Sequence, residues 1–373
     1  MFNRNFSLLL GANILMSAAM PMLIILGGLA GISLAPAPML ATLPPTVQLI
    51  IGVAVAAPIS VFMGRFGRQA GFALASTLLV VGGLVGVAAL FTQSFITLCA
   101  AHIILGTGLI CVNYFRFAAA DAVAEAHKAQ AMSVIIASGL VAALLGPKLF
   151  NTFSDALAPI PFAGAYLAIA VLGLLGAVPV AGLRLTHHQT AAPRVKGQII
   201  AVLRTNPKII TAIAVAAFAQ TTMVFLMIPT PLAMIGCGLG ADHAADVIRW
   251  HVVAMFAPGL ITGTLIARVG SKTIAVAGVA LLLVSALIAL SGQTLFAFYL
   301  SLITLGVGWN FGFVGGSHML QSATQPADRP LIQGINEMIL AICGAGAALV
   351  SGVIFALLGW SVLAAIAAAL ICA

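Results

Sequence analysis

Long apolar segments follow one another along almost the whole chain, and they limit its possible folds more than any other feature. A helix needs roughly 20 apolar residues to cross the hydrocarbon core of a bilayer. The predicted spans are residues 6–31, 39–63, 71–91, 95–121, 129–150, 161–183, 208–235, 244–266, 273–291, 294–319, 329–356 and 359–373. The last is short for a span, so it stays open whether the helix is complete and whether the chain continues past Ala373. The pattern predicts an all-α membrane protein with twelve transmembrane helices.

Composition agrees with a lipid environment. The chain is 62% hydrophobic and only 6% charged, with a mean hydropathy of +1.22, whereas about a quarter of the residues in a soluble domain are charged. The net charge of +8 does not indicate nucleic-acid binding, because the positive residues stand singly or in pairs between apolar spans. That distribution is typical of the cytoplasmic loops of membrane proteins.

The positive residues also predict the orientation of the chain. With the N-terminus in the cytoplasm, only Lys148 and Arg249 fall on the outer side, and Arg116 lies inside a span. The residues that fall on the cytoplasmic side are Arg4, Arg65, Arg68, Lys128, Arg184, Arg194, Lys196, Arg204, Lys208, Arg268, Lys272 and Arg329. Since Lys and Arg concentrate in cytoplasmic loops, we predict a multi-pass protein of the bacterial inner membrane. Residues 6–31 are interpreted as the first span and not as a signal peptide, because their removal would invert this charge distribution.

The longest hydrophilic interval, residues 184–208, carries five basic residues and no acid. It divides the chain into an N-terminal six-helix bundle at 1–183 and a C-terminal bundle at 209–373, and we interpret it as a cytoplasmic linker. Its segment 197–204 is a candidate for a short helix at the membrane surface.

The two halves repeat each other at a nearly constant distance. Arg65 and Gly67 match Arg268 and Gly270, each 203 positions later, and the Leu-Gly-x-Gly sequence at 105–108 returns 200 positions later. Such repeats indicate that a unit of six spans was duplicated, which builds two pseudo-symmetric bundles.

Residues 64–69, Gly-Arg-Phe-Gly-Arg-Gln, resemble the signature loop of the major facilitator superfamily, G-x-x-x-D-R-x-G-R-R/K. The resemblance implies a secondary transporter that works by alternating access, with a substrate site near the midplane between the bundles, lined by spans one, four, seven and ten. Ser60 replaces the first glycine. Gly64 replaces the aspartate, and the absence of that aspartate puts the family's locking interaction in doubt. The conformational loop residues implied are Gly64, Arg65, Gly67, Arg68, Arg268 and Gly270.

A narrower resemblance concerns three stretches, residues 115–121, 139–147 and 308–313. They look like a bacterial branch of the superfamily that includes riboflavin-uptake permeases. This resemblance implies a flat, aromatic substrate that forms hydrogen bonds.

Arg116 is the most informative single residue, because an arginine inside a span is costly and usually marks a transport pathway or a partner. It is a candidate for binding substrate or for gating. The alternatives are that it reaches the cytoplasmic interface or pairs locally with Asp121 or Glu125.

Glu337 is the only acid deep in a predicted span, at a depth close to that of Arg116. We hypothesise that the two form a charge pair or that Glu337 couples transport to protons, since burial can bring a carboxylate into the neutral range. The alternative is a structural acid that is hydrogen-bonded to Asn336, to Gln333 or to a neighbouring span. The candidates for proton coupling or gating are Glu337, Arg116, Asp121 and His102. His251 and His318 are further candidates, and a hydrogen-bonded structural role is the more readily supported alternative for each of the three histidines.

Amides and aromatic side chains inside the spans predict the substrate site, because together they suit stacking and edge hydrogen bonds to a planar ligand. The candidates are Asn13, Ser17, Asn113, Tyr114, Arg116, Gln220, Trp309, Asn310 and Phe313. Ordinary helix packing and hydrogen bonds between helices are the alternative, and successive residues of a helix cannot all face one way.

Other chemistry finds little support. The five cysteines are scattered without metal-ligand spacing, and the Gly-x-Gly pairs lie inside apolar spans where a nucleotide-binding loop has no context. We therefore expect no cofactor, no metal, no nucleic acid and no enzymatic activity, and a monomer whose partners are the lipid bilayer, a small-molecule substrate and protons. The predicted function is import of a small organic solute, with riboflavin or a similar vitamin as the first candidate. The alternatives are a proton-coupled multidrug exporter and, from another class, a membrane enzyme or a receptor.

Overall fold

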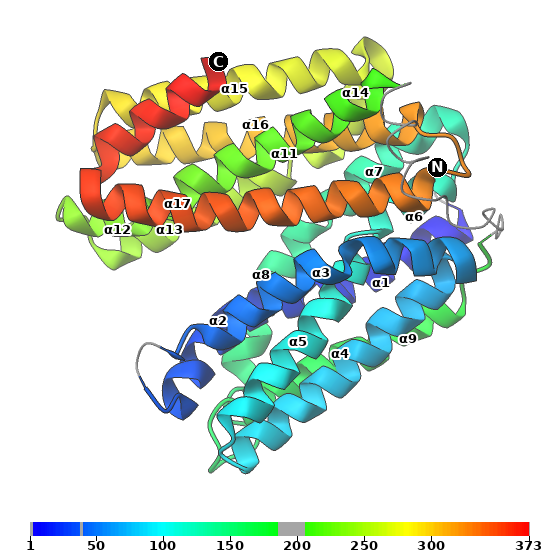
Figure 1. The fold of residues 1–373 in the computed structure, drawn as a ribbon, viewed down its shortest axis with the longest axis vertical. Coiled ribbons are helices and arrows are strands. Elements are labelled where there is room, and N and C mark those ends of the chain that lie inside the picture. Colours follow the sequence, from blue (N-terminus) through cyan, green and yellow to red (C-terminus); the bar gives the residue numbers. More distant parts are fainter. Residues whose placement is uncertain (1–2, 38–39, 186–205, 373) are drawn as a thin grey trace. The chain divides into compact units, whose positions relative to one another are not determined.

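The computed structural model describes residues 3–37, 40–185 and 206–372, and these are mainly helical. The helices, in chain order, are α1 (Arg4–Ser17), α2 (Ala19–Leu34), α3 (Leu43–Phe66), α4 (Arg68–Phe91), α5 (Phe95–Val112), α6 (Phe115–Asp121), the short 3₁₀ helix η2 (Glu125–His127), α7 (Lys128–Ala137), α8 (Gly139–Phe153), α9 (Ala163–Ala181), α11 (Pro207–Met227), α12 (Thr230–Gly236), α13 (Ala241–Phe256), α14 (Gly259–Val269), α15 (Ser271–Ser291), α16 (Leu295–Ala323) and α17 (Arg329–Cys372) (Figure 1). The predicted all-α class is confirmed for the described part of the chain.

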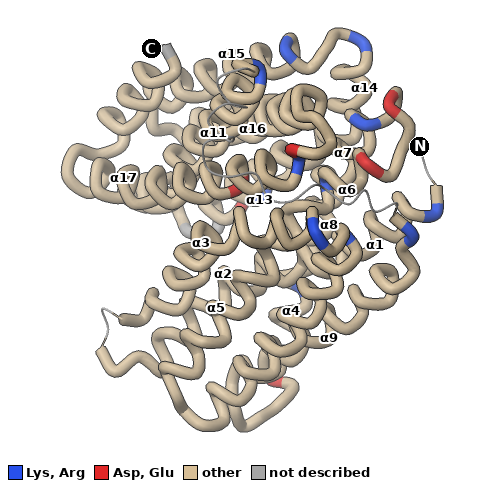
Figure 2. Tube along the Cα trace, turned by 45° about the vertical axis from the view of Figure 1, so that its right-hand side comes forward, with Lys and Arg blue, Asp and Glu red and all other residues tan. Residues whose placement is uncertain are grey.

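Within the described residues, eleven helical stretches are long and apolar enough to cross a membrane. Several of them consist of two helices separated by a short break. Pro229 precedes α12 and Pro258 precedes α14, and a proline interrupts a helix because it has no N–H to donate and its ring clashes with the preceding turn. Figure 2 shows that most charged residues lie near helix ends, so long stretches of helix carry no charge.

The last two predicted spans, 329–356 and 359–373, both fall within α17. Gly359 interrupts this helix with a φ of 77°, and beyond it the chain turns back (Figure 1). The segment after the break is anchored, because the Trp360 indole donates to the backbone oxygen of Ala289 at 3.0 Å. Eleven stretches are thus found where the sequence predicted twelve spans, and the separate twelfth span is not confirmed.

The chain forms two compact units. Unit 1 comprises Met1–Ala124, Ser138–Pro193 and Pro326–Met338, and unit 2 comprises Glu125–Ala137, Arg194–Gln325 and Ile339–Ala373. Helix α7 therefore belongs to unit 2, and the first residues of α17 belong to unit 1. Residues 186–205 of the predicted linker, including the candidate surface helix at 197–204, lie outside the described residues, and the predicted boundaries at 183 and 209 stay predictions.

In unit 1, α4 packs between α5 and α9, and α3 packs against α5. Gly83 is required at the α4–α9 contact, because a Cβ there would lie 2.7 Å from the backbone oxygen of Tyr166. In unit 2, α16 is the central helix and packs against α11, α13 and α15. Gly278 of α15 meets α16 closely enough that a Cβ would lie 2.5 Å from the Gly312 nitrogen. Small residues that let helix backbones approach are typical of membrane helix packing.

The two units repeat the same local geometry. Gly67 ends α3 with φ 91° and ψ 155°, and its counterpart Gly270 ends α14 with φ 87° and ψ 152°. These are the glycines of the repeated loop, and their left-handed φ is one that other residues rarely adopt. The structure therefore gives both copies of the predicted loop motif the same turn.

Candidate functional site

Arg116 and Glu337 form a buried ion pair in unit 1. Arg116, on α6, is 5% exposed and Glu337, on α17, is 4% exposed, and one guanidinium nitrogen, Nη2, bonds to Glu337 Oε1. The same carboxylate oxygen accepts from Asn336 Nδ2 at 2.8 Å, and the Phe117 ring centre lies 4.5 Å from Arg116 Cζ. Two opposite charges thus neutralise each other where neither could be accommodated alone.

A break between α5 and α6 positions this arginine. The backbone N–H groups of Asn113 and Tyr114 bond to carbonyl oxygens only three residues earlier, so a tight turn separates the two helices. The Asn113 carbonyl then accepts from Arg116 Nη1 at 2.9 Å, while the Asn113 side chain is exposed. Tyr114 is buried, and its hydroxyl donates to the backbone oxygen of Ala56 on α3 at 2.7 Å.

Asp121 connects two basic residues at the end of α6. Its carboxylate lies 3.0 Å from Arg329 Nη1 and 3.8 Å from Arg68 Nη2, and Arg68 also donates to Gln333 Oε1. All of these residues belong to unit 1. The loop at residues 64–69 has Gly64 where the motif it resembles has an aspartate, and the acid near Arg68 is instead Asp121.

The other loop residues are more peripheral. Arg65 is exposed and its guanidinium carbon lies 5.4 Å from the Phe66 ring centre, and Arg268 in the second copy is exposed as well.

Asn13 and Ser17 make hydrogen bonds inside unit 1. Asn13 is buried, and its Nδ2 donates to Ser138 Oγ at 2.9 Å. The Ser17 hydroxyl donates to Asn13 Oδ1 at 3.3 Å and stays half-buried. Because Ser138 stands at the break between α7 and α8, Asn13 ties that break to α1.

His102 lies in a separate polar network of unit 1. Its Nδ1 is 2.9 Å from Gln48 Oε1 and its Nε2 is 2.8 Å from the Tyr166 hydroxyl, and all three side chains are buried. His102 precedes Arg116 by 14 positions in one span, which is about 20 Å along a helix. Gln48 and Tyr166 were not among the predicted site residues, although a lone glutamine in an apolar span was a visible signal.

Two further histidines lie in unit 2. His251 is fully buried, with Nδ1 2.7 Å from the backbone oxygen of Leu302. His318 is half-buried on α16. Neither belongs to the unit that contains the Arg116–Glu337 pair.

Unit 2 brings together three predicted substrate residues. The Trp309 indole N–H of α16 donates to Gln220 Oε1 of α11 at 2.9 Å. The Trp309 ring is stacked on Phe313, with ring centres 4.8 Å apart, and meets Phe256 edge-on at 5.9 Å. Trp309 is 5% exposed, whereas Gln220 and Phe313 are half-buried. Phe256 was not predicted, because it stands at the end of α13, far from the cluster in sequence.

Asn310 has a structural position. It is fully buried, its Nδ2 donates to the Met255 backbone oxygen at 2.7 Å, and its Oδ1 accepts from Thr262 Oγ1 at 2.7 Å. These partners lie on either side of the break between α13 and α14, so the amide holds the two helices to α16.

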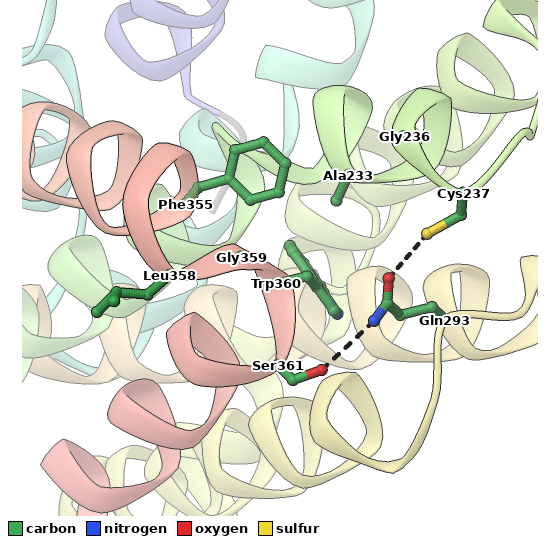
Figure 3. A pocket seen from close by; sticks show the side chains of 9 residues that line it. All are labelled: Ala233, Gly236, Cys237, Gln293, Phe355, Leu358, Gly359, Trp360 and Ser361. Atoms are coloured by element: carbon green, nitrogen blue, oxygen red, sulfur yellow. Dashed lines mark hydrogen bonds between the residues drawn. The ribbon is translucent and has the colours of Figure 1, made fainter.

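A cavity of about 330 Å³ also lies in unit 2, between the end of α12, the loop before α16 and the Gly359 break (Figure 3). Its polar lining is neutral: the Cys237 thiol lies 2.8 Å from Gln293 Oε1, and Gln293 Nε2 lies 3.4 Å from Ser361 Oγ. None of the predicted site residues lines it. Among the described residues, no group of three or more His, Cys, Asp and Glu side chains could hold a metal ion.

Sequence comparison finds related transporters. The chain is 37% identical over 367 residues to the riboflavin transporter RfnT of Brucella anthropi, covering 96% of this chain and 90% of that one. It is 33% identical to the uncharacterised MFS-type transporter YddS of Bacillus subtilis, covering 86% of this chain and 77% of the relative. No protein-family model matches the chain.

Comparison with solved structures concerns the fold. The Escherichia coli fucose:proton symporter FucP superposes with a TM-score of 0.80 at 14% identity, covering 98% of this chain and 96% of the other. The human organic anion transporter MFSD10 superposes with a TM-score of 0.76 at 14% identity, covering 99% and 97%. Because both superpose along nearly their whole length, this chain shares their fold.

Proposed function

The chain belongs to the major facilitator superfamily of transporters, and on this premise we propose that it imports riboflavin or a closely similar planar vitamin. The observation that carries the proposal is the 37% identity to a riboflavin transporter along 96% of the chain. A substrate of this kind needs an apolar environment with a few oriented polar groups, and the cluster of Gln220, Trp309 and Phe313 supplies that combination.

We further propose the membrane arrangement. α17 contributes two spans, with the Gly359 break as the turn between them, which gives twelve spans with the N-terminus in the cytoplasm. The bundles are residues 1–183 and 209–373, joined by the basic linker, in a bacterial inner membrane. The excess of Lys and Arg in the loops assigned to the cytoplasm supports this orientation.

Substrate contact is assigned to the predicted residues that keep exposed surface. These are Gln220 and Phe313 in unit 2, and Ser17 and Asn113 in unit 1. Asn13, Tyr114, Trp309 and Asn310 are buried and bonded within their units, which supports a role in holding the site rather than touching the solute.

Arg116 and Glu337 are proposed to couple or gate transport. A proton arriving at Glu337 would cancel its charge and weaken the bond to Arg116, which links protonation to a change in packing. Asp121 is assigned to gating through Arg68 and Arg329. His102 is the least supported of the predicted proton-coupling residues, because its ring is occupied by Gln48 and Tyr166.

Uptake of labelled riboflavin tests the function. Cells that cannot make riboflavin and lack their own importer should grow on low external riboflavin when they express the chain, and should accumulate the label. Collapse of the proton gradient should reduce accumulation if transport is proton-coupled. Equal accumulation with and without the chain would contradict import, and increased resistance to lipophilic drugs on expression would favour the exporter instead.

A further inference from the structure

Trp309 fixes the orientation of the Gln220 amide. The indole is held between Phe313, stacked at 4.8 Å, and Phe256, edge-on at 5.9 Å, and is 5% exposed. An indole N–H can donate a hydrogen bond but cannot accept one. Its partner at 2.9 Å is therefore the amide oxygen of Gln220. The amide nitrogen, with two hydrogens to donate, is directed away from the indole.

The surroundings of that nitrogen leave it accessible. In the part of the chain that the structure describes, Gln220 Nε2 makes no hydrogen bond, and the side chain is half-buried. Gly344 of α17 lies beside it, and a Cβ at this position would come within 3.6 Å of Nε2. Glycine at 344 thus leaves the nitrogen uncovered from the α17 side. All of these residues belong to unit 2.

From this geometry we infer that Gln220 selects the substrate by donating from Nε2 to a ring carbonyl oxygen of a planar solute. Trp309 is the positioning residue that prevents the amide from presenting its oxygen instead. The inference rests on the proposed function, because the riboflavin ring system carries carbonyl oxygens along one edge. A solute with an amino group at that place would set donor against donor and leave both unpaired, which is strongly disfavoured in a buried site.

Equilibrium binding to the purified full chain tests this selection. The ligands are riboflavin and two analogues, in each of which an amino group replaces one ring carbonyl oxygen. The wild type should bind one analogue at least about tenfold more weakly than riboflavin, since one lost hydrogen bond corresponds to roughly that factor. Gln220→Met should weaken riboflavin binding about tenfold and leave the disfavoured analogue unchanged.

Trp309→Phe gives the sharper result. It keeps an aromatic ring against Phe313 and Phe256 but removes the N–H, so the Gln220 amide can turn its oxygen toward the ligand. The affinity for the disfavoured analogue should rise several-fold, a gain that a damaged fold would not produce. Gly344→Ala places a methyl group in ordinary contact with Nε2 and should weaken riboflavin binding without a clash.

Thr221→Val is the matched control, because its hydroxyl bonds to the Ala217 backbone oxygen at 2.7 Å. It should leave the affinities for riboflavin and for the disfavoured analogue unchanged. If the wild type binds riboflavin but neither Gln220→Met nor Trp309→Phe alters the ratio of its affinity for riboflavin to that for the disfavoured analogue, the inference is wrong and the proposed function stands. If the wild type binds no flavin, the proposed function and the inference both fail.

Discussion

At the residue scale, the buried pair of Arg116 and Glu337 has a large energetic consequence. Breaking a buried pair leaves one charge uncompensated, whereas replacing both partners by apolar residues of similar size is often neutral. Asn336 and the Asn113 carbonyl add hydrogen bonds to the two charged groups. If the proposed coupling role holds, stability and coupling depend on the same side chains, and separate measurements of unfolding and of transport distinguish them.

Removing one charge should destabilise the protein. Arg116→Met leaves Glu337 buried without its cation, so we expect a loss of about 3–5 kcal/mol in the free energy of unfolding. The double variant Arg116→Met/Glu337→Met should recover most of that loss and still fail to transport. Thermal unfolding in detergent measures the stability of the two variants, and uptake of labelled riboflavin measures transport. Lys148→Met, at an exposed position, is the control and should change stability by less than about 0.5 kcal/mol. A double variant as unstable as the single one would refute this account of the pair.

Neutralising the acid should separate coupling from binding. Glu337→Gln also leaves Arg116 without its counter-charge and so lowers stability, but it keeps the size and an oxygen that can accept a hydrogen bond from Arg116, and its amide does not titrate. We expect riboflavin binding and exchange of labelled for unlabelled riboflavin to persist, while accumulation driven by a proton gradient is lost. Transport assays in vesicles with an imposed pH gradient measure this. Undiminished gradient-driven accumulation would remove Glu337 from the coupling mechanism.

At the element scale, glycine controls how helices end and how closely they approach. Gly67 and Gly270 end α3 and α14 with the same left-handed backbone, so the duplicated loop is a duplicated turn. Gly263 of α14 lies against α7, where a Cβ would come 2.4 Å from Gln130 Cα. This close approach is one reason why α7 packs into unit 2.

Alanine at the two turn glycines should cost stability. Both glycines combine a positive φ with a ψ near 150°, a backbone region that only glycine adopts readily and that costs another residue on the order of 1–3 kcal/mol. Gly67→Ala and Gly270→Ala should therefore each lower the free energy of unfolding by that amount. Gly346→Ala is the matched control, because that glycine lies inside α17 with open space around it and alanine favours a helix by up to about 1 kcal/mol. Denaturation curves in detergent compare the three. Equal effects at all three positions would show that backbone strain is not the cause.

At the scale of the whole molecule, duplication is visible in contacts as well as in sequence. In unit 1 a Cβ on Gly106 would lie 2.8 Å from the backbone oxygen of Gln48. In unit 2 a Cβ on Gly306 would lie 2.8 Å from the backbone oxygen of His251. Gly306 follows Gly106 by 200 positions and His251 follows Gln48 by 203, which are the two repeat distances found in the sequence. The charged residues of the two halves have diverged. For example, Gln321 stands 200 positions after Asp121, where the second half has no acid.

The orientation in the membrane can be checked by cysteine labelling. Cys237 is exposed after α12, and with twelve spans and a cytoplasmic N-terminus it faces outward. A membrane-impermeant maleimide should label it in intact cells. Arg268→Cys in a Cys237→Ser background places a thiol in the last turn of α14, at its proposed cytoplasmic end, and labelling should then require permeabilised cells. Labelling of Arg268→Cys from outside would overturn the proposed topology.

The sequence by itself determined the class, the family resemblance and the approximate spans, because transfer of a helix into lipid depends on the summed hydrophobicity of consecutive residues. It also identified Arg116 and Glu337, since a charge within an apolar span is visible without a structure. Only the tertiary structure decided that α7 and the first residues of α17 join units other than those of their neighbours in the chain. It alone showed that Asn310 and Tyr114 bond to backbone oxygens while the Gln220 amide is turned by Trp309, 89 positions away. Such pairings depend on the rotation and spacing of packed helices, which local hydrophobicity does not specify.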